Sequence, residues 1–327
     1  MENKLLSFLT TAVEKGWLPG FSSVFIANGK QDIVIKGNKA TYPETESLTS
    51  ASIYDIASLT KVLVTTTLVL QLVEEKKLEL SGKVKDYLPE FNDTEVTLSD
   101  LLTHCSGLPA DTVLDLNWSI ETYRDQLYKT PLSEKGKVQY SDIGFILLGW
   151  IIETVTGEAL SQLSTERIVH PLALKDTGYN LERPTERFVP TEKRADTGLK
   201  RGQAHDRKAA YLGGVSGHAG WFTTIEDSAV LLKSLLNGSS PVFPASYKQW
   251  MSEYAGNGRT LGWEWRKSVK GDNYLYHTGF TGVFMFVNVT KKRGGVVLTN
   301  SIHPKRDNPY KEKRNQLIEQ LFTEGWL

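Results

Sequence analysis

The sequence has almost no cysteine and no surplus of charge of either sign. Cys105 is the one cysteine in 327 residues, and 38 Lys and Arg side chains balance 38 Asp and Glu side chains. A single thiol excludes an intrachain disulfide and a CxxC redox or zinc motif. Zero net charge removes the long-range field that nucleic acid or an anionic membrane would require. We therefore expect a small-molecule partner, with no nucleic acid and no membrane, and interpret Cys105 as a small buried thiol.

Long hydrophobic runs are missing as well. The longest apolar stretch, Val62–Val73, runs for about 12 residues and includes three threonines, whereas a membrane span needs about 20 residues. The N-terminal apolar patch from Leu5 to Val13 is interrupted by polar residues and lacks an A-x-A cleavage site. It predicts an amphipathic helix rather than a secretory signal, and hence a cytoplasmic protein.

Strand patterns occupy both ends of the chain and helical patterns its middle. Two β-rich runs, 23–27 and 32–35, flank an Asn-Gly turn and predict a hairpin. Helical patterns then follow at 60–76, 99–104, 120–128, 141–156 and 160–169. Further strands, and a last helix, are predicted at 261–266, 274–277, 283–289, 295–299 and 310–322.

This order of elements predicts an α+β fold, in the form of an α/β sandwich. Its antiparallel sheet is built from both chain termini and flanked by the first and last helices, with a mostly helical subdomain inserted. We expect one catalytic domain over residues 1–327. Its α/β subdomain would comprise about 1–60 and 205–327, and its helical subdomain about 61–204. The junction between two such parts is a common place for a ligand site.

Ser58 and Lys61 are the first candidates for chemistry. They lie where the chain enters the long apolar helix, three residues apart and therefore on one helix face. A serine hydroxyl needs an adjacent base to act as a nucleophile, and a lysine amine in an apolar setting can serve. The backbone N–H of Ser58 at the helix start can also stabilise an oxyanion. Taken alone, Ser58 is equally typical of a plain helix cap.

Two further short motifs are candidates. Tyr140-Ser141-Asp142 stands at the start of a predicted helix, and His277-Thr278-Gly279 stands at the end of a predicted strand. A glycine at such a strand end lets the backbone approach a ligand closely. Each motif by itself is also typical of a structural turn or helix cap.

Together, the three motifs resemble those of the serine β-lactamase and penicillin-binding-protein superfamily. The sequence resembles its class C β-lactamase-like branch, which includes serine esterases and D-stereospecific peptidases. The order is that of the family: Ser-x-x-Lys, then Tyr-x-Asp/Asn, then Lys/His-Thr-Gly. The resemblance covers nearly the whole chain, through the stretches 56–61, 101–108, 140–145, 213–220 and 277–282.

The resemblance implies a role for each matching residue. Ser58 matches the nucleophile that forms an acyl-enzyme, Lys61 its partner, and Tyr140 the tyrosine that shares the acid and base role. The backbone N–H groups of Ser58 and Phe280 match the oxyanion hole. The implied substrate-binding residues are Asp142, His277, Thr278 and Gly279. The resemblance implies neither a metal nor a cofactor.

Two positions depart from the family pattern. Asp142 stands where many members have Asn, and His277 where penicillin-recognising members usually have Lys. A carboxylate that faces Lys61 would favour its ammonium form and leave Tyr140 as the base. A mostly neutral histidine removes a partner for the carboxylate of penicillins and D-alanyl peptides. We therefore expect a serine hydrolase that acts as a carboxylesterase on small short-acyl esters.

Two alternatives stay open at this point. One is a D-alanyl carboxypeptidase or β-lactamase, and the other is a catalytically silent, acylatable binding or sensor module. The glycine-dense segment Gly213–Gly220 lacks the spacing of a nucleotide-binding loop and is expected to form a wall of the cleft, with His218 satisfied in a turn. His205-Asp206 is interpreted either as an edge of the site or as a cap of the following segment. The histidines show no metal-ligand spacing.

Overall fold

The strands from the two ends of the chain form one seven-stranded antiparallel sheet. The computed structural model describes residues 2–237, 240–288 and 290–324. The strand order is β3-β2-β1-β12-β11-β10-β9, so the first hairpin pairs directly with the last strand. These strands are β1 (Gly20–Ala27), β2 (Lys30–Ala40), β3 (Glu46–Ser47), β9 (Glu264–Lys267), β10 (Asn273–Thr278), β11 (Phe284–Asn288) and β12 (Arg293–Thr299). The predicted sheet of both termini is therefore confirmed.

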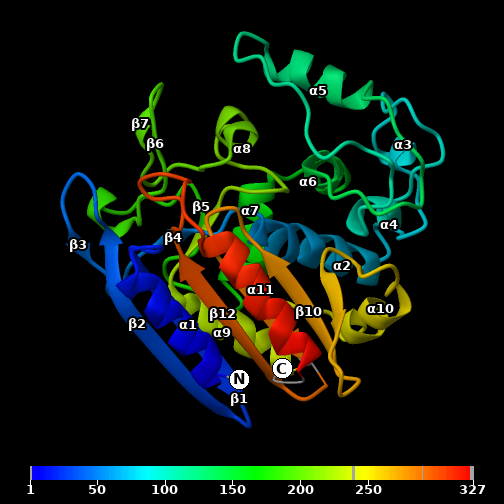
Figure 1. Ribbon diagram of the computed structural model, residues 1–327. Helices are drawn as coiled ribbons and strands as arrows, with labels where there is room; N and C mark the ends of the chain where they lie inside the picture. Colours follow the sequence, from blue (N-terminus) through cyan, green and yellow to red (C-terminus); the bar gives the residue numbers. More distant parts are fainter. Residues whose placement is uncertain (1, 238–239, 289, 325–327) are drawn as a thin grey trace.

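Helices fill most of the chain between the two groups of strands (Figure 1). The α-helices are α1 (Glu2–Glu14), α2 (Thr66–Glu74), α3 (Val84–Tyr87), α4 (Leu98–Leu102), α5 (Ile120–Tyr128), α6 (Asp142–Thr156), α7 (Leu160–Ser164), α8 (Arg207–Tyr211), α9 (Ile225–Asn237), α10 (Tyr247–Glu253) and α11 (Tyr310–Thr323). The other helical turns are η1 (Lys61–Thr65), η2 (Thr165–Val169) and η3 (Thr185–Arg187). Short strands form two small sheets: β4 (Tyr54–Asp55), β5 (Gly178–Tyr179) and β8 (Trp221–Thr223); β6 (Lys193–Arg194) and β7 (Gly198–Leu199).

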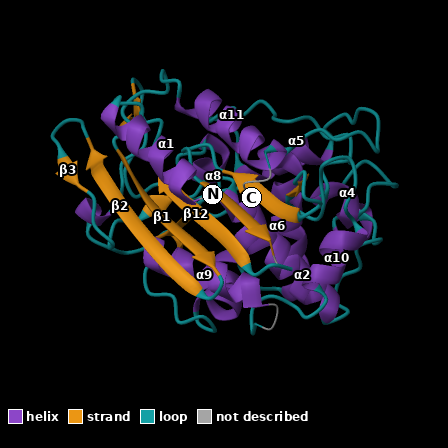
Figure 2. Cartoon of the chain, turned by 60° about the horizontal axis from the view of Figure 1, so that its bottom comes forward, coloured by secondary structure: helices purple, strands orange, loops and turns teal. Residues whose placement is uncertain are grey.

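Each face of the large sheet is covered by helices, as Figure 2 shows. The terminal helices α1 and α11 lie on one face, where Leu5 and Leu321 pack in a cluster with Phe284 of β11. On the other face, Met285 of β11 belongs to the main core together with Leu232 of α9. Because alternate residues of one strand are buried in two different cores, β11 is apolar on both faces. Val289, the last residue of the strand predicted there, lies outside the described residues.

The long apolar segment after Ser58 forms the central helix of the molecule. Its first turn, η1, is a π-helix, and α2 continues from it without interruption. Two of the threonines in this buried run are hydrogen bonded: Thr65 Oγ1 donates to the carbonyl of Gly217 at 2.6 Å, and Thr67 Oγ1 to that of Val62 at 3.2 Å. These bonds remove most of the cost of burying those two hydroxyl groups. The Oγ1 of Thr66 is buried without a hydrogen-bond partner among the described residues.

Some sequence expectations need correction. The strand expected over 261–266 begins only at Glu264, because Gly262 adopts a φ of +79° and turns the chain before it. Cys105 is half-buried rather than buried, with its Sγ 3.5 Å from the carbonyl oxygen of Thr103. The segment 183–207, for which no helix or strand is predicted from the sequence, contains η3 and the short β6–β7 hairpin.

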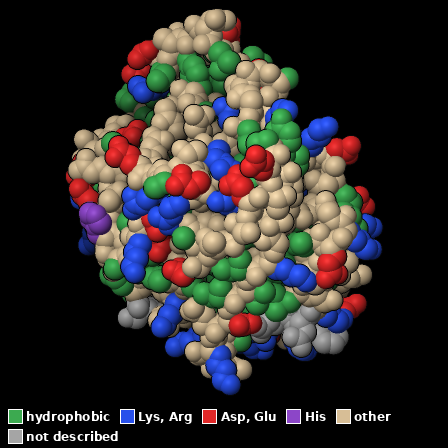
Figure 3. Space-filling view, turned by 90° about the vertical axis from the view of Figure 1, so that its left-hand side faces the viewer, with side chains coloured by type: hydrophobic (Ala, Val, Ile, Leu, Met, Phe, Trp, Pro, Cys, Tyr) green, Lys and Arg blue, Asp and Glu red, His purple; other side chains and the backbone are tan. Residues whose placement is uncertain are grey.

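Among the described residues, no single helix has the length and hydropathy of a membrane span. Helices α6 and α7–η2 meet those limits only jointly, across a bend of 88°. Figure 3 shows a face of the molecule on which basic and acidic side chains are interspersed, in keeping with a net charge of zero.

Candidate active site

Ser58 stands at a sharp turn between strand β4 and the central helix. The preceding residue, Ala57, has a φ of +47°, a left-handed conformation that is unfavourable for a residue with a Cβ. The buried Asp55 carboxylate holds this turn, because it accepts hydrogen bonds from Ala57 N at 2.8 Å and from His205 N at 2.7 Å. Burial raises the pKa of Asp55 to about 6, and those two hydrogen bonds oppose the rise. The strained turn leaves Ser58 half-exposed at the start of the helix.

Lys61 is fully buried directly beneath Ser58. Its Nζ donates to Ser58 Oγ at 2.9 Å and to the backbone carbonyl of His218 at 3.1 Å. The same nitrogen lies 2.8 Å from Asp142 Oδ1, the first residue of α6. The structure thus brings Ser58, Lys61 and Asp142 together, and the condition that Asp142 face Lys61 is met.

The charges of Lys61 and Asp142 stabilise each other. Burial alone lowers the pKa of Lys61, but Asp142 and Tyr140 outweigh burial and hold that pKa above its usual value. Burial alone raises the pKa of Asp142, but the charges of Lys61, His218 and Lys208 hold that pKa well below its usual value. Lys61 is therefore an ammonium and Asp142 a carboxylate near neutral pH.

Tyr140 lies against this ion pair. Its ring centroid is 5.1 Å from Lys61 Nζ, and the ring of His104 packs on it at a centroid distance of 4.4 Å. His104 is buried and adopts a φ of +58°, and its Nδ1 accepts a hydrogen bond from Ser141 N at 3.0 Å. These contacts fix the backbone and the ring of the tyrosine beside the nucleophile. This packing role of His104 was not predicted from the sequence, where the histidines show only that metal-ligand spacing is lacking.

The His-Thr-Gly motif forms the end of β10, opposite Ser58. His277 is buried, its Nδ1 is 2.9 Å from the carbonyl of Thr278, and burial, followed by the charges of Arg259 and Lys61, holds its pKa well below the usual value. It is therefore neutral. Gly279 packs so closely on the chain before Ser58 that a Cβ at this position would overlap the Ile56 carbonyl oxygen. Only glycine permits this approach.

Phe280 follows the motif and lines the cleft that contains Ser58. Its side chain is 44% exposed. The ring of His205 stacks on it at 5.4 Å, and Lys311 Nζ lies 3.6 Å from its centroid. Phe280 and Ser58 line the same cleft, and the role of their backbone N–H groups as an oxyanion hole stays a prediction.

Ser58, Tyr140 and Phe280 are shared by two adjoining chambers of the cleft. The loop-side chamber has a volume of about 620 Å³. It is also lined by Ala57, Asp111, Thr112, Leu114, Leu116, Asp142, Arg194, His205, Asp206, Arg207, Lys208, Ala219 and Arg306. The strand-side chamber has a volume of about 340 Å³ and is also lined by Arg259, Glu264, His277, Thr278, Gly279, Lys311 and Arg314. The nucleophile therefore has room for a substrate group on either side.

The strand-side chamber carries more positive than negative charge. Among its described lining residues, Arg259, Lys311 and Arg314 are cationic and Glu264 is the one carboxylate. Arg259 packs over the Tyr140 ring at 5.4 Å, and its Nη1 is buried without a hydrogen-bond partner among the described residues. These cations could not be predicted, because nothing in the sequence around positions 259 and 311 connects them with the motifs.

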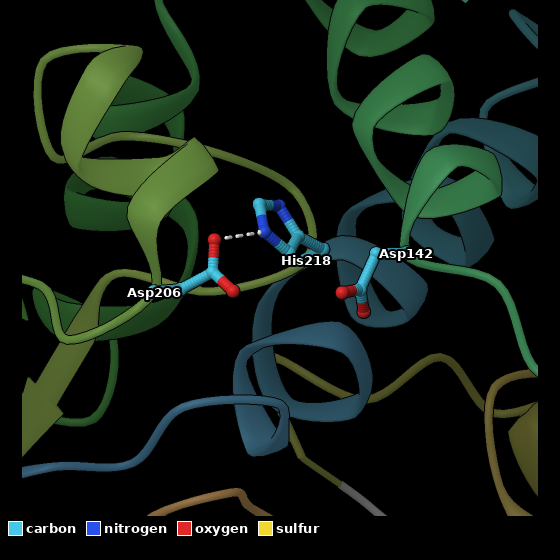
Figure 4. Close-up of side chains that lie close together, drawn as sticks. All are labelled: Asp142, Asp206 and His218. Atoms are coloured by element: carbon cyan, nitrogen blue, oxygen red, sulfur yellow. Dashed lines mark hydrogen bonds and ion pairs between the residues drawn. The ribbon is translucent and has the colours of Figure 1, made fainter. Parts of the chain in front are cut away.

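The wall formed by the glycine-dense segment supports Lys61 through His218. Figure 4 shows His218 between Asp206 and Asp142. His218 Nε2 is 2.8 Å from Asp206 Oδ1 and Nδ1 is 2.8 Å from Ser216 Oγ, so both ring nitrogens have partners. Asp206 also caps α8 by accepting from Lys208 N and Ala209 N. The pair His205-Asp206 therefore does both things considered for it, since it borders the cleft and caps a helix.

The same cluster has the donor types of a metal site. One ligand atom each of Asp142, Asp206 and His218 lies within 4.8 Å of the others. However, Asp142 already contacts two ammonium groups, Lys61 at 2.8 Å and Lys208 at 3.1 Å. A divalent cation would be repelled by both lysines. The cluster is therefore an ion-pair network, and its residues do not fit a metal.

Comparisons with known proteins agree with this geometry. The sequence model of the Beta-lactamase family matches residues 7–320. The chain is 31% identical to a protein named "Putative D-alanyl-D-alanine carboxypeptidase" from Escherichia coli (strain K12), over 85% of this chain and 76% of that protein. It is 29% identical to an "N-acetylmuramyl-L-alanine amidase" from Bacillus subtilis (strain 168), over 98% and 86%.

Solved structures share the fold. A class C beta-lactamase from Rhodobacter sphaeroides superposes with a TM-score of 0.74 at 20% identity, covering 94% of this chain and 95% of that one. EstCE1, described as a hydrolase with promiscuous acyltransferase activity, superposes with a TM-score of 0.76 at 18% identity, covering 95% and 96%. At these identities the likeness concerns the fold.

Proposed function

The chain belongs to the beta-lactamase family of serine hydrolases, and we propose that it hydrolyses small acyl compounds through an acyl-enzyme on Ser58. The observation that carries the proposal is the 2.9 Å hydrogen bond from the buried Lys61 to Ser58 Oγ, at the meeting point of two chambers. Ser58 Oγ attacks the acyl carbon, and the N–H groups of Ser58 and Phe280 stabilise the oxyanion. The leaving group departs with a proton, and water then cleaves the Ser58 ester.

Tyr140 is the base that fits this arrangement. Asp142 keeps Lys61 as an ammonium, which has no lone pair to accept the proton of Ser58. The Tyr140 oxygen therefore takes that proton and passes it to the leaving group, while the Lys61 charge stabilises the phenolate. In deacylation the same oxygen accepts a proton from the attacking water and returns it to Ser58.

The charge of the strand-side chamber supports a substrate with a carboxylate. Arg259, with its unpartnered Nη1, lies over the base, and Lys311 lies over Phe280. These cations can take the role of the family lysine that His277 replaces. Relatives named carboxypeptidase and amidase also favour an amide or peptide substrate. We therefore place a D-alanyl carboxypeptidase-like or amidase-like activity first, and revise the expectation that a carboxylate is disfavoured.

The carboxylesterase expected from the sequence is the second candidate. His277 is neutral, and the half-buried Leu114 and the exposed Leu116 give the loop-side chamber an apolar wall that suits a short uncharged acyl group. The two candidates share the nucleophile and the base, and they differ in whether the substrate must carry a negative charge.

The two candidate activities can be distinguished with a peptide substrate and its uncharged amide. The purified protein is assayed with an acylated D-Ala-D-Ala peptide, with the C-terminal amide of the same peptide, with p-nitrophenyl acetate, butyrate and octanoate, and with nitrocefin. Ser58→Ala should abolish every activity. Arg259→Gln should lower kcat/KM for the free-acid peptide by about 10- to 100-fold, the value of a charged hydrogen bond, and leave the acetate ester unchanged. Lys267→Gln, on the neighbouring strand outside the chamber, is the control.

The results of this assay distinguish the candidate functions. Equal turnover of the acid and the amide, or turnover of esters alone, refutes the carboxylate requirement and favours the esterase. Activity retained in Ser58→Ala refutes the acyl-enzyme. A stable mass increase at Ser58 with no turnover would identify an acylatable sensor instead of an enzyme.

A further inference from the structure

Lys208 is a buried cation that the proposed mechanism does not use. It belongs to the first turn of α8, and its side chain is 7% exposed. Its Nζ lies 3.1 Å from Asp142 Oδ2 and 2.5 Å from Asp111 Oδ1. Asp142 Oδ1 holds Lys61 at 2.8 Å. One carboxylate therefore bridges two ammonium groups, one of which contacts the nucleophile.

Helix α8 reaches Lys61 by a second route as well. Its cap, Asp206, holds the ring of His218, and the backbone carbonyl of His218 accepts from Lys61 Nζ at 3.1 Å. The five residues Lys61, Asp142, Lys208, Asp206 and His218 form a closed ring, because Lys208 and Asp206 are joined through the start of the helix. A change in the charge of α8 therefore acts on two of the groups that contact Lys61 Nζ, the Asp142 carboxylate and the His218 carbonyl.

We propose that Lys208 is a positioning residue that sets the proton affinity of the Ser58–Lys61–Tyr140 centre by sharing the Asp142 carboxylate. This inference rests on the proposed function. Lys208 binds one oxygen of the Asp142 carboxylate, which weakens the attraction between that carboxylate and Lys61. It also places a second positive charge on the opposite side of the same carboxylate. Both effects make it easier for the neighbouring groups to lose a proton.

Other charged and titratable groups surround Lys61 and Lys208. Asp111 comes from the loop before α5, Asp142 from α6, Asp206 from the cap of α8, and Tyr123 from α5. Tyr140, His104 and His277 lie on the far side, toward Lys61. Arg259 also adds positive charge on that side. Lys208 is the cation that contacts Asp142 from the loop-side chamber.

The sign of the effect does not depend on which group is the base. Loss of a nearby positive charge makes it harder to remove a proton from the base, whether Lys61 or Tyr140 acts as that base, because the proton then leaves a more negative site. The rate of reaction at Ser58 falls at low pH because the base becomes protonated, and we call this fall the acidic limb of the rate profile. The acidic limb should therefore move to higher pH when Lys208 loses its charge. A shift of about 1 pH unit is expected for a charge that acts through one bridging carboxylate.

The test measures how fast Ser58 reacts with a fluorophosphonate probe between pH 5 and 10, by intact mass, so that no substrate needs to be known. Lys208→Met should shift the acidic limb up by about 1 unit, and Lys208→Arg should restore it. Asp111→Asn removes a negative charge on the other side of Lys208 and should shift the limb down. Lys233→Met, which removes an exposed lysine of α9 outside both chambers, is the matched control and should leave the limb in place.

A purely structural role for Lys208 would lower the labelling rate at every pH without moving the limb, and that result overturns the proposal. An unchanged profile in Lys208→Met overturns it too. If Lys208→Met does not fold, the opposite shift in Asp111→Asn decides alone. Failure of the proposed function looks different, since labelling would then persist in Ser58→Ala.

Discussion

Replacing Asp142 with Asn tests the ion-pair network at its centre. The substitution keeps the shape of the side chain and restores the residue that many family members have. It removes a carboxylate that is 19% exposed and contacts two lysines whose side chains are 0% and 7% exposed. Removing one partner of a buried ion pair costs about 3 to 5 kcal/mol, because the remaining charge is left without compensation.

The lower end of that range applies here. The Asn oxygen can still accept from one lysine, but the amide N–H₂ then faces the other ammonium. Lys61 can also relieve its uncompensated charge by losing a proton. We therefore expect a loss of about 3 kcal/mol of unfolding free energy at pH 7, or roughly 4 °C in Tm for a chain of this size.

The pH dependence of this difference follows from the two pKa shifts. Asp142 has its pKa held below the usual value, so its contribution is present above about pH 4, the unfolded pKa, and is lost as the pH falls further. Lys61 has its pKa held above the usual value, so its contribution is present below about pH 10 and is lost as the pH rises. The difference between wild type and Asp142→Asn should therefore be lost below about pH 4, and it should shrink at alkaline pH, where Lys61 of the variant loses its proton.

Urea denaturation of both proteins from pH 3 to 9, with thermal melts alongside, measures this difference. Asp196→Asn is the control, because its ion pair with Arg207 is 55% and 63% exposed and should contribute less than about 1 kcal/mol. Wild-type and Asp142→Asn proteins of equal stability at pH 7, or a difference that grows below pH 4, would refute the reasoning.

Three further predictions follow from the site. Tyr140→Phe should lower kcat by about 10² to 10⁴ without changing Tm, as expected for an acid and base; near-normal turnover would remove it from that role. Burial, with Arg314 and Arg306 nearby, lowers the pKa of Lys311 to about 8, so KM for a carboxylate-bearing substrate should rise above pH 8, and Lys311→Arg should abolish this rise. Gly279→Ala should lose activity and about 1 to 3 kcal/mol of stability, because its methyl group would overlap Val283; Gly256→Ala, with open space around it, is the control, and equal losses would contradict the packing argument.

Much of the fold could be predicted because local signals agreed with tertiary structure. The Asn28-Gly29 turn, with both residues at positive φ, connects β1 and β2 as the sequence indicates. The helix predicted at 120–128 matches α5 residue for residue. Helix α8 was missed, because its five residues lie in a charged stretch without periodicity and depend on the Asp206 cap.

Only those residues of the site that belong to a sequence motif could be predicted. Ser58, Lys61 and Tyr140 stand in short motifs whose order is informative, and the structure brings them together. Arg259 and Lys208 come from a turn and a short helix that are far from the motifs in sequence, and only tertiary packing gives them a place in the cleft. The subdomain limits, the cytoplasmic location and the lack of nucleic-acid or membrane partners stay predictions.

The pairing of β1 with β12 has a consequence for when the enzyme acquires its activity. Phe21 lies opposite Thr299, so the sheet that supports Ser58 cannot close until nearly the whole chain has left the ribosome. Contacts over such separations are also slow to form. Ser58 and Lys61 are therefore synthesised long before β12, but the sheet beside them can be completed only after β12 has been made.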